Sequence, residues 1–122
     1  MYTIAKTFGF EAAHHLPHLP DGHKCRRPHG HSYTAEIVFE SASLDEFGFV
    51  VDYGQLDVVK RWIDTTLDHH DLNAYLAQPS AEHLAQYIFG RVFDFPFGDI
   101  DRVRLVAVRV SETRATWAEW RP

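Results

Sequence analysis

The order of hydrophobic periodicities along the chain is the feature that most restricts its fold. Residues 2–10, 29–41 and 102–112 alternate apolar and polar side chains, which is the period of a half-buried β-strand. Between them, residues 52–67 and 80–92 repeat apolar side chains at the spacing of an amphipathic helix. With the final segment "TWAEW" as a last strand, the order is ββααββ. We therefore expect an α+β fold.

Local signals predict where several of these elements begin. Asp52, with Gln55 three positions later, resembles a capping box, and Ser80 can cap the second helix. The segment "FVV" at 49–51 is predicted to form a short strand before the first helix. In the last long strand, alternation predicts one face made of Val106, Val108, Val110 and Glu112.

Size and composition predict one compact domain over residues 1–122. The chain is 45% hydrophobic and 14% aromatic, which is ample for a packed core, and it has no internal repeat or linker-like run. No segment is long and apolar enough to span a bilayer. A single cysteine cannot form an internal disulfide, so we expect a soluble cytoplasmic protein. The net charge of −5 argues against a nucleic-acid-binding surface.

Nine histidines, most of them clustered, suggest a metal site. His29 and His31 are two apart on a predicted strand, so their imidazoles share one face, and His14 near the end of the first strand is a natural third ligand. Three neutral nitrogen ligands leave a fourth position open, as in catalytic zinc sites. Hydrogen-bonded histidines at a strand end would give the same pattern without a metal, so the spacing alone leaves both interpretations open.

The proline-rich loop at 16–28 contains the only cysteine, between basic residues. Beside a divalent cation, and between Lys24 and Arg26, the thiolate of Cys25 would be stabilised and could act as a general base. The alternative is a small hydrophobic side chain packed in the loop. Together with Arg27, the two basic neighbours make a positive loop that suits a small anionic ligand.

Two further groups of acidic residues are candidates for proton transfer or ligand binding. In "DHHDLN", either Asp68 with His69 or Asp71 with His70 can form a carboxylate–imidazole pair, although histidines at a helix C-terminus would look the same. Glu112 ends an apolar stripe, where a carboxylate needs a partner. A planar ligand with adjacent N–H donors would satisfy it, and so would a nearby arginine.

Several motifs occur together in an order that resembles the 6-pyruvoyl-tetrahydropterin synthase family. They cover nearly the whole chain and are "FEAAHHLPHLPDGHKCRRPHGHSY", "VVDYGQL", "LDHHDLN", "PSAEHLA" and "VSET". Within the family, the preceding "DGHKC" and the short spacing between the cysteine and His-Gly-His resemble the bacterial branch that makes 6-carboxy-5,6,7,8-tetrahydropterin. The branch that makes the pyruvoyl product typically places more residues between them.

The resemblance implies a role for each matching residue. It places the family's zinc ligands on His14, His29 and His31, its catalytic cysteine on Cys25, and its aspartate–histidine pair on Asp68 and His69. Glu112 matches the pterin-anchoring glutamate. Ser80 and Glu82 match a segment bordering the pterin pocket, where Ala81 replaces a frequent hydroxyl residue. The candidates for binding the triphosphate are Lys24, Arg26 and Arg27.

The fold and activity implied by the resemblance are equally specific. The family has a tunnelling fold (T-fold), in which an antiparallel sheet carries two helices on one face and the sheets of several subunits join into a barrel. The implied protein is a homo-oligomer, a trimer or hexamer, with active sites at subunit interfaces. The implied reaction is the zinc-dependent conversion of 7,8-dihydroneopterin triphosphate to 6-carboxytetrahydropterin, with release of acetaldehyde and triphosphate, in queuosine biosynthesis.

Three alternatives remain distinct from this function. The product of the same scaffold could instead be the pyruvoyl or a side-chain-shortened pterin. A non-catalytic metal-binding module would use the histidines without Cys25, Asp68 or Glu112. A cupin-type enzyme would need Glu36 beside His31, but their spacing puts the two on opposite faces of a regular strand.

Overall fold

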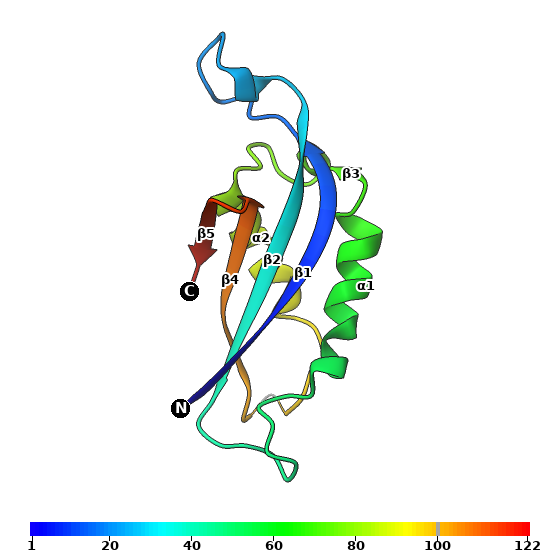
Figure 1. Ribbon diagram of the computed structural model, residues 1–122, viewed down its shortest axis with the longest axis vertical. Coiled ribbons are helices and arrows are strands. Elements are labelled where there is room, and N and C mark those ends of the chain that lie inside the picture. Colours follow the sequence, from blue (N-terminus) through cyan, green and yellow to red (C-terminus); the bar gives the residue numbers. More distant parts are fainter. Residues whose placement is uncertain (100) are drawn as a thin grey trace.

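A five-stranded sheet with two helices on one face forms the core of the protein (Figure 1). The computed structural model describes residues 1–99 and 101–122. The elements in chain order are β1 (Tyr2–His14), β2 (His29–Ser41), α1 (Asp57–Thr66), β3 (His70–Asp71), α2 (Ala81–Val92), β4 (Arg104–Thr113) and β5 (Thr116–Trp120). The sheet order is β3-β1-β2-β4-β5, and every pair is antiparallel except β1 with β3. The predicted α+β class is confirmed, whereas the two-residue β3 was not predicted.

The long pairing of β1 with β2 builds the face on which the helices lie. Its register runs without a shift from Tyr2 opposite Ser41 to His14 opposite His29. Alternate side chains of both strands are buried in the core: Phe8, Phe10, Ala12, Tyr33, Ala35, Ile37 and Phe39. The predicted alternation is therefore the one that the structure uses.

Both helices bury the apolar stripe that the sequence predicts. The stripe of α1 and its flanks comprises Leu56, Val59, Ile63 and Leu67, and that of α2 includes Leu84, Ile88 and Val92. The hydroxyl of Ser80 accepts a hydrogen bond from the backbone N–H of His83 at 3.2 Å, which confirms the predicted cap. Asp52 instead caps a 3-10 turn, Tyr53–Leu56, through the N–H of Gly54, so the α-helix begins later than predicted.

The prediction of a strand at residues 49–51 is wrong. Val50 and Val51 are buried in a loop, not paired in the sheet. The guanidinium of Arg102 supplies donors to this segment instead, at 2.8 Å from the carbonyl oxygen of Val50 and 3.4 Å from that of Phe49. Side-chain donors thus satisfy backbone groups that a strand would have paired.

The prediction that Val106 shares a face with Val108 and Val110 is also wrong. A register shift between Val38 and Phe39 of β2 interrupts its ladder with β4. Val106 consequently packs with Val38 and Ala107 in a small cluster apart from the main core. A bulge adds one residue to a strand, so residues of the same parity before and after it point to opposite faces of the sheet. Alternation counted through the bulge therefore assigns Val106 to the wrong face.

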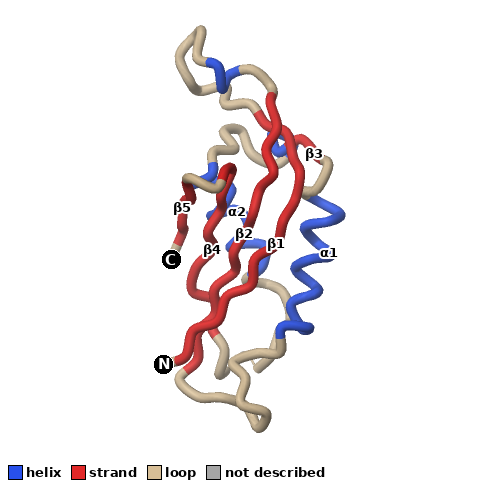
Figure 2. The backbone as a smooth tube through the Cα atoms, viewed as in Figure 1, coloured by secondary structure: helices blue, strands red, loops and turns tan. Residues whose placement is uncertain are grey.

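The arrangement of the strands places one loop beyond the end of the sheet. The chain between β1 and β2 extends past their paired ends and contains the 3-10 turn Lys24–Arg26 (Figure 2). The histidine that ends β1 and the one that begins β2 lie at the base of this loop. No helix within the described residues is long and apolar enough to cross a membrane.

Candidate active site

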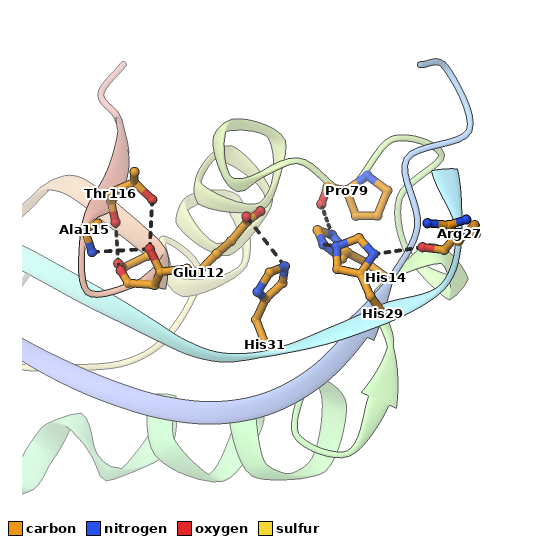
Figure 3. Close-up of polar contacts among 10 residues, drawn as sticks. His14, Arg27, His29, His31, Pro79, Glu112, Ala115 and Thr116 are labelled. Atoms are coloured by element: carbon orange, nitrogen blue, oxygen red, sulfur yellow. Dashed lines mark hydrogen bonds and ion pairs between the residues drawn. The ribbon is translucent and has the colours of Figure 1, made fainter. Parts of the chain in front are cut away.

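Three histidines converge at the end of the β1–β2 pairing (Figure 3). His14 and His29 are opposite each other in the ladder, and His31 is two residues further along β2 on the same face. One ligand nitrogen from each residue lies within 4.8 Å of the other two. Only 1% of His14 is exposed, whereas the other two are partly exposed. The structure thus brings together the three predicted ligands and leaves His15 outside the group.

Backbone carbonyls fix the protonation of two of these imidazoles. The Nδ1 of His14 lies 2.8 Å from the carbonyl oxygen of Pro79, and that of His29 lies 2.8 Å from the carbonyl oxygen of Arg27. Because a carbonyl only accepts, each Nδ1 carries the proton and each neutral ring has its lone pair on Nε2. These two Nε2 atoms face each other at 3.0 Å. Two opposed lone pairs need a cation or a further proton between them.

The residues therefore fit a metal ion bound through nitrogen. Burial lowers the pKa of His14 and favours the neutral form that binds a metal. The Nε2 of His31 is buried without a hydrogen-bond partner within residues 1–99 and 101–122. Carbonyl-oriented histidines with free Nε2 atoms are typical metal ligands, and a set of nitrogen donors suits zinc.

Glu112 borders the histidine group without joining it. Its Oε2 lies 3.7 Å from the Nε2 of His31, too far for a hydrogen bond. In the described part of the chain, the group of mutually close ligand atoms contains only the three histidines. A metal held there would keep a position for an exogenous oxygen.

A cavity of about 510 Å³ joins the histidines to the loop between β1 and β2. Its wall includes Cys25, Lys24, Arg27 and Glu112 in addition to the three imidazoles. Cys25 is partly exposed, and its backbone N–H donates to the Nδ1 of His23 at 3.1 Å. The predicted thiol, two predicted phosphate-binding residues and the predicted pterin anchor thus share one cavity with the metal ligands.

Arg26 does not line this cavity. Its guanidinium donates to the carbonyl oxygen of Leu19 at 2.8 Å and lies 3.2 Å from a carboxylate oxygen of Asp21. Both partners belong to the same loop, so Arg26 braces the loop. Of the three predicted phosphate-binding residues, only Lys24 and Arg27 line the cavity.

The aspartate–histidine pair in "DHHD" is Asp68 with His69. One Asp68 oxygen accepts the backbone N–H of Glu11 at 2.8 Å, and the other lies 3.0 Å from the Nδ1 of His69. The Glu11 N–H bond and, next, the His69 bond lower the pKa of Asp68. Asp71 instead accepts the N–H of Asn73 at 3.0 Å, and the Nδ1 of His70 lies 2.7 Å from the carbonyl oxygen of Asp68.

The structure does not bring His69 to Cys25 within one chain. His69 is highly exposed, and its φ of 59° is held by a bond from its own N–H to the carbonyl oxygen of Glu11. It lines a separate open cavity of about 570 Å³, whose wall includes Glu11, Ser32 and His70. His31 borders both cavities, but Cys25 and Glu112 line only the other one.

Ser80 and Glu82 are also outside the wall of the cavity that contains Cys25. The Ser80 hydroxyl serves as the cap of α2, and Glu82 is exposed in its first turn. This segment reaches the histidines through the backbone carbonyl of Pro79, which no sequence motif predicts. A backbone carbonyl leaves no signature in the sequence.

Tyr33 also lies beside the site, although it was not predicted as a site residue. Its ring is 1% exposed, and it packs edge-on against His14 and His31 at centroid distances of 5.8 and 5.4 Å. Burial, and secondarily the charge of Glu112, raises the pKa of Tyr33 well above its ordinary value, so the phenol stays neutral. The sequence indicates its position only through strand alternation, which places Tyr33 on the same face as His29 and His31.

Known proteins share this sequence pattern and this fold. Residues 3–122 match the family described as 6-pyruvoyl tetrahydropterin synthase. The chain is 35% identical over 121 residues to a 6-carboxy-5,6,7,8-tetrahydropterin synthase from Synechocystis, covering 93% of this chain and 92% of that protein. It is 32% identical over 77 residues to a dihydroneopterin monophosphate aldolase from Pyrococcus furiosus, covering 63% of this chain and 66% of the relative.

A solved structure has the same fold at lower sequence identity. The 6-pyruvoyl tetrahydropterin synthase of Caenorhabditis elegans superposes with a TM-score of 0.84 at 22% identity, covering 99% of this chain and 95% of that one. At this identity the superposition shows the T-fold and nothing about the substrate.

Proposed function

Because the chain belongs to the 6-pyruvoyl tetrahydropterin synthase family, we propose that it is a metal-dependent 6-carboxy-5,6,7,8-tetrahydropterin synthase. It would convert 7,8-dihydroneopterin triphosphate and one water molecule to 6-carboxytetrahydropterin, acetaldehyde and triphosphate, as a cytoplasmic step of queuosine biosynthesis. The observation that carries the proposal is the grouping of three Nε2 atoms with Cys25 and Glu112 at one cavity. A non-catalytic metal-binding module would need neither the thiol nor the carboxylate.

The proposed cofactor is zinc, held by His14, His29 and His31. When bound, zinc would act as a Lewis acid toward a substrate oxygen and would raise the acidity of the adjacent C–H group. The carbonyls of Pro79 and Arg27 keep the Nε2 atoms of His14 and His29 free for this ion.

Groups of the cavity wall have complementary roles in the proposal. Cys25 Sγ accepts a proton from the substrate side chain, and Lys24 and Arg27 compensate the charge of the triphosphate. The two oxygens of Glu112 accept hydrogen bonds from adjacent N–H groups of the pterin ring, and this orients the side chain of the substrate toward Cys25. Arg26 supports this arrangement indirectly by bracing the loop.

His69 completes the site from a neighbouring subunit in this proposal. Asp68 orients its ring through Nδ1, which leaves Nε2 free to exchange a proton with the substrate. The separation of the two cavities within one chain supports this arrangement. Ser80 and Glu82 are proposed to border the pterin at the same interface. A homo-oligomer, a trimer or hexamer built as a barrel, would join these parts.

The sheet has edges that such a barrel would cover. β3 pairs with β1 only at Ala12 and Ala13, and β5 is the last strand on the other side. Unpaired edges recruit further strands, so pairing between subunits would protect them. Residues 1–122 are proposed to act as one domain in this assembly.

Product analysis tests the proposed reaction against its alternatives. We expect zinc-loaded protein incubated with 7,8-dihydroneopterin triphosphate to give 6-carboxytetrahydropterin and acetaldehyde, identified by mass spectrometry. A pyruvoyl product, or the shortened side chain suggested by the similarity to an aldolase, would replace the proposed activity by a related one. Unconsumed substrate in the presence of bound zinc would contradict a catalytic role. His31→Ala protein, which should lose zinc, is the control.

A further inference from the structure

Tyr33 carries a buried polar group that the proposed chemistry leaves unused. Its side chain is 1% exposed, and its hydroxyl has no hydrogen-bond partner among residues 1–99 and 101–122. A buried hydroxyl without a partner costs free energy, and native proteins keep few of them. The hydroxyl therefore requires a partner in some state of the protein.

Packing fixes where the Tyr33 ring lies. It stacks on Phe10 with ring centroids 5.1 Å apart and an angle of 7° between the planes. On other sides it contacts the edges of His14 and His31, at angles of 87° and 79°. The ring is therefore held against two of the candidate metal ligands and cannot turn its hydroxyl to bulk water without disturbing them.

The carboxylate of Glu112, which lies near Tyr33, has no hydrogen-bond partner among residues 1–99 and 101–122. In the β2–β4 ladder Thr34 lies opposite Ser111, so Tyr33 and Glu112 follow one position further along these two neighbouring strands. Both side chains also lie against His31, whose ring centroid is 5.4 Å from that of Tyr33. Among the described residues, the ion-pair partner of this carboxylate is the Nε2 of His31, 3.7 Å from Oε2, which is too far for a hydrogen bond. If a metal ion is bound to the Nε2 of His31, this nitrogen can no longer donate a hydrogen bond to Glu112. The carboxylate would then be attracted to the metal ion, unless another donor holds it in place.

We propose that Tyr33 is a positioning residue for Glu112, whose carboxylate accepts a hydrogen bond from the Tyr33 hydroxyl when the three histidines hold a metal. The bond keeps Glu112 directed at the pterin and away from the remaining coordination position. This inference rests on the proposed function, and it assigns Tyr33 a role in substrate affinity, not in metal binding or proton transfer.

The substitution Tyr33→Phe separates this role from a merely structural one. Removal of an unpartnered hydroxyl should leave the melting temperature of metal-free protein unchanged or raised. The zinc content should stay at the wild-type level. Affinity for neopterin, an oxidised analogue that cannot react, should fall about tenfold, because a hydrogen bond to a charged group is lost. KM for 7,8-dihydroneopterin triphosphate should rise by a similar factor with little change in kcat.

Two controls make the experiment specific. Tyr87→Phe removes a hydroxyl from α2, where the ring packs near Trp62 and Tyr75, and should leave neopterin binding unchanged. In a Glu112→Ala background, Tyr33→Phe should have no further effect on neopterin affinity, because the acceptor is gone.

The outcomes distinguish this inference from the proposed function. Equal neopterin affinity of Tyr33→Phe and wild type would overturn the inference, as would loss of zinc or an undiminished effect in the Glu112→Ala background. A wild-type protein that binds zinc but neither binds neopterin nor consumes the substrate would contradict the proposed function itself, and the inference with it.

Discussion

Backbone carbonyls decide the chemistry of two histidines at the scale of single residues. His14 and His29 each direct Nδ1 to a carbonyl oxygen at 2.8 Å, so each presents the lone pair of Nε2. His31 contributes an Nε2 without a partner in the described part of the chain. The site is thus prepared for a cation by the tautomers of its ligands, a property that residue types alone do not carry.

The thiol in the loop is the residue whose removal should separate catalysis from metal binding. We expect Cys25→Ala to lower kcat by at least about 10²-fold, the typical contribution of a positioned general base. Zinc content should be unchanged, because Cys25 is not among the mutually close ligand atoms. Steady-state kinetics and metal analysis measure the two effects. Turnover close to wild type would remove the thiol from the mechanism.

The charge of Asp68 should matter for catalysis, because the carboxylate orients His69. We expect Asp68→Asn to lower kcat about 10²-fold, because the ring of His69 loses its charged partner. Asp71→Asn is a matched control, since that carboxylate caps a turn through Asn73. A similar loss of kcat in both variants would show that the local fold, not the dyad, was disturbed.

The lowered pKa of Asp68 also sets a sign for the pH dependence of stability. Because the pKa of Asp68 is lower in the folded than in the unfolded protein, its ionised carboxylate stabilises the fold. This stabilisation is fully present above the pKa of the unfolded state and is lost as the pH falls through the lower pKa of the folded state. The difference in unfolding free energy between wild type and Asp68→Asn should therefore be constant near neutral pH and shrink below about pH 3.8. A difference that grew with acidity would contradict this assignment.

The part of the site that the sequence could predict is the part that follows from the alternation of side chains along a strand. The facing of His29 and His31 follows from a period of two, and His14 follows from its place at the end of β1. The contributions of Pro79 and Glu11 could not be predicted, because they act through backbone groups of distant segments. Nor does spacing tell which cavity His69 enters.

At the scale of elements, the unshifted pairing of β1 with β2 delivers His14 and His29 to one point. The alternation of apolar and polar residues made β1 and β2 predictable, and the capping residue Ser80 made the start of α2 predictable. Predictions failed where tertiary contacts replaced a local rule. Arg102 holds the segment at 49–51 as a loop, and a bulge beside Val38 turns Val106 out of the main core.

The cap of α2 allows a direct test of an element boundary. Ser80→Ala removes the acceptor of the His83 N–H and should lower the free energy of unfolding by about 1 kcal/mol. Ser80→Thr keeps a hydroxyl acceptor and should retain most of the stability. Chemical denaturation measures both variants. Equal midpoints for Ser80→Ala and wild type would show that the hydroxyl is not a cap in solution.

At the scale of the whole molecule, Cys25 and His69 line separate cavities of one chain. The proposed oligomer reunites them from two subunits, and its construction predicts complementation. Protein co-expressed from equal amounts of Cys25→Ala and His69→Ala chains should regain activity up to about one quarter of wild type, because half of the chains supply each intact residue. Each variant alone should stay at least about 10²-fold below wild type. A mixture no more active than the single variants would contradict the shared site.

The central claim is that three imidazoles hold one metal ion and leave a position for the substrate. Anomalous diffraction at the zinc edge, from crystals grown with zinc, tests this claim most directly. The predicted result is one peak surrounded by the Nε2 atoms of His14, His29 and His31, with the remaining position open to solvent. A peak elsewhere, or one whose coordination is completed by Glu112 or Cys25, would contradict the account.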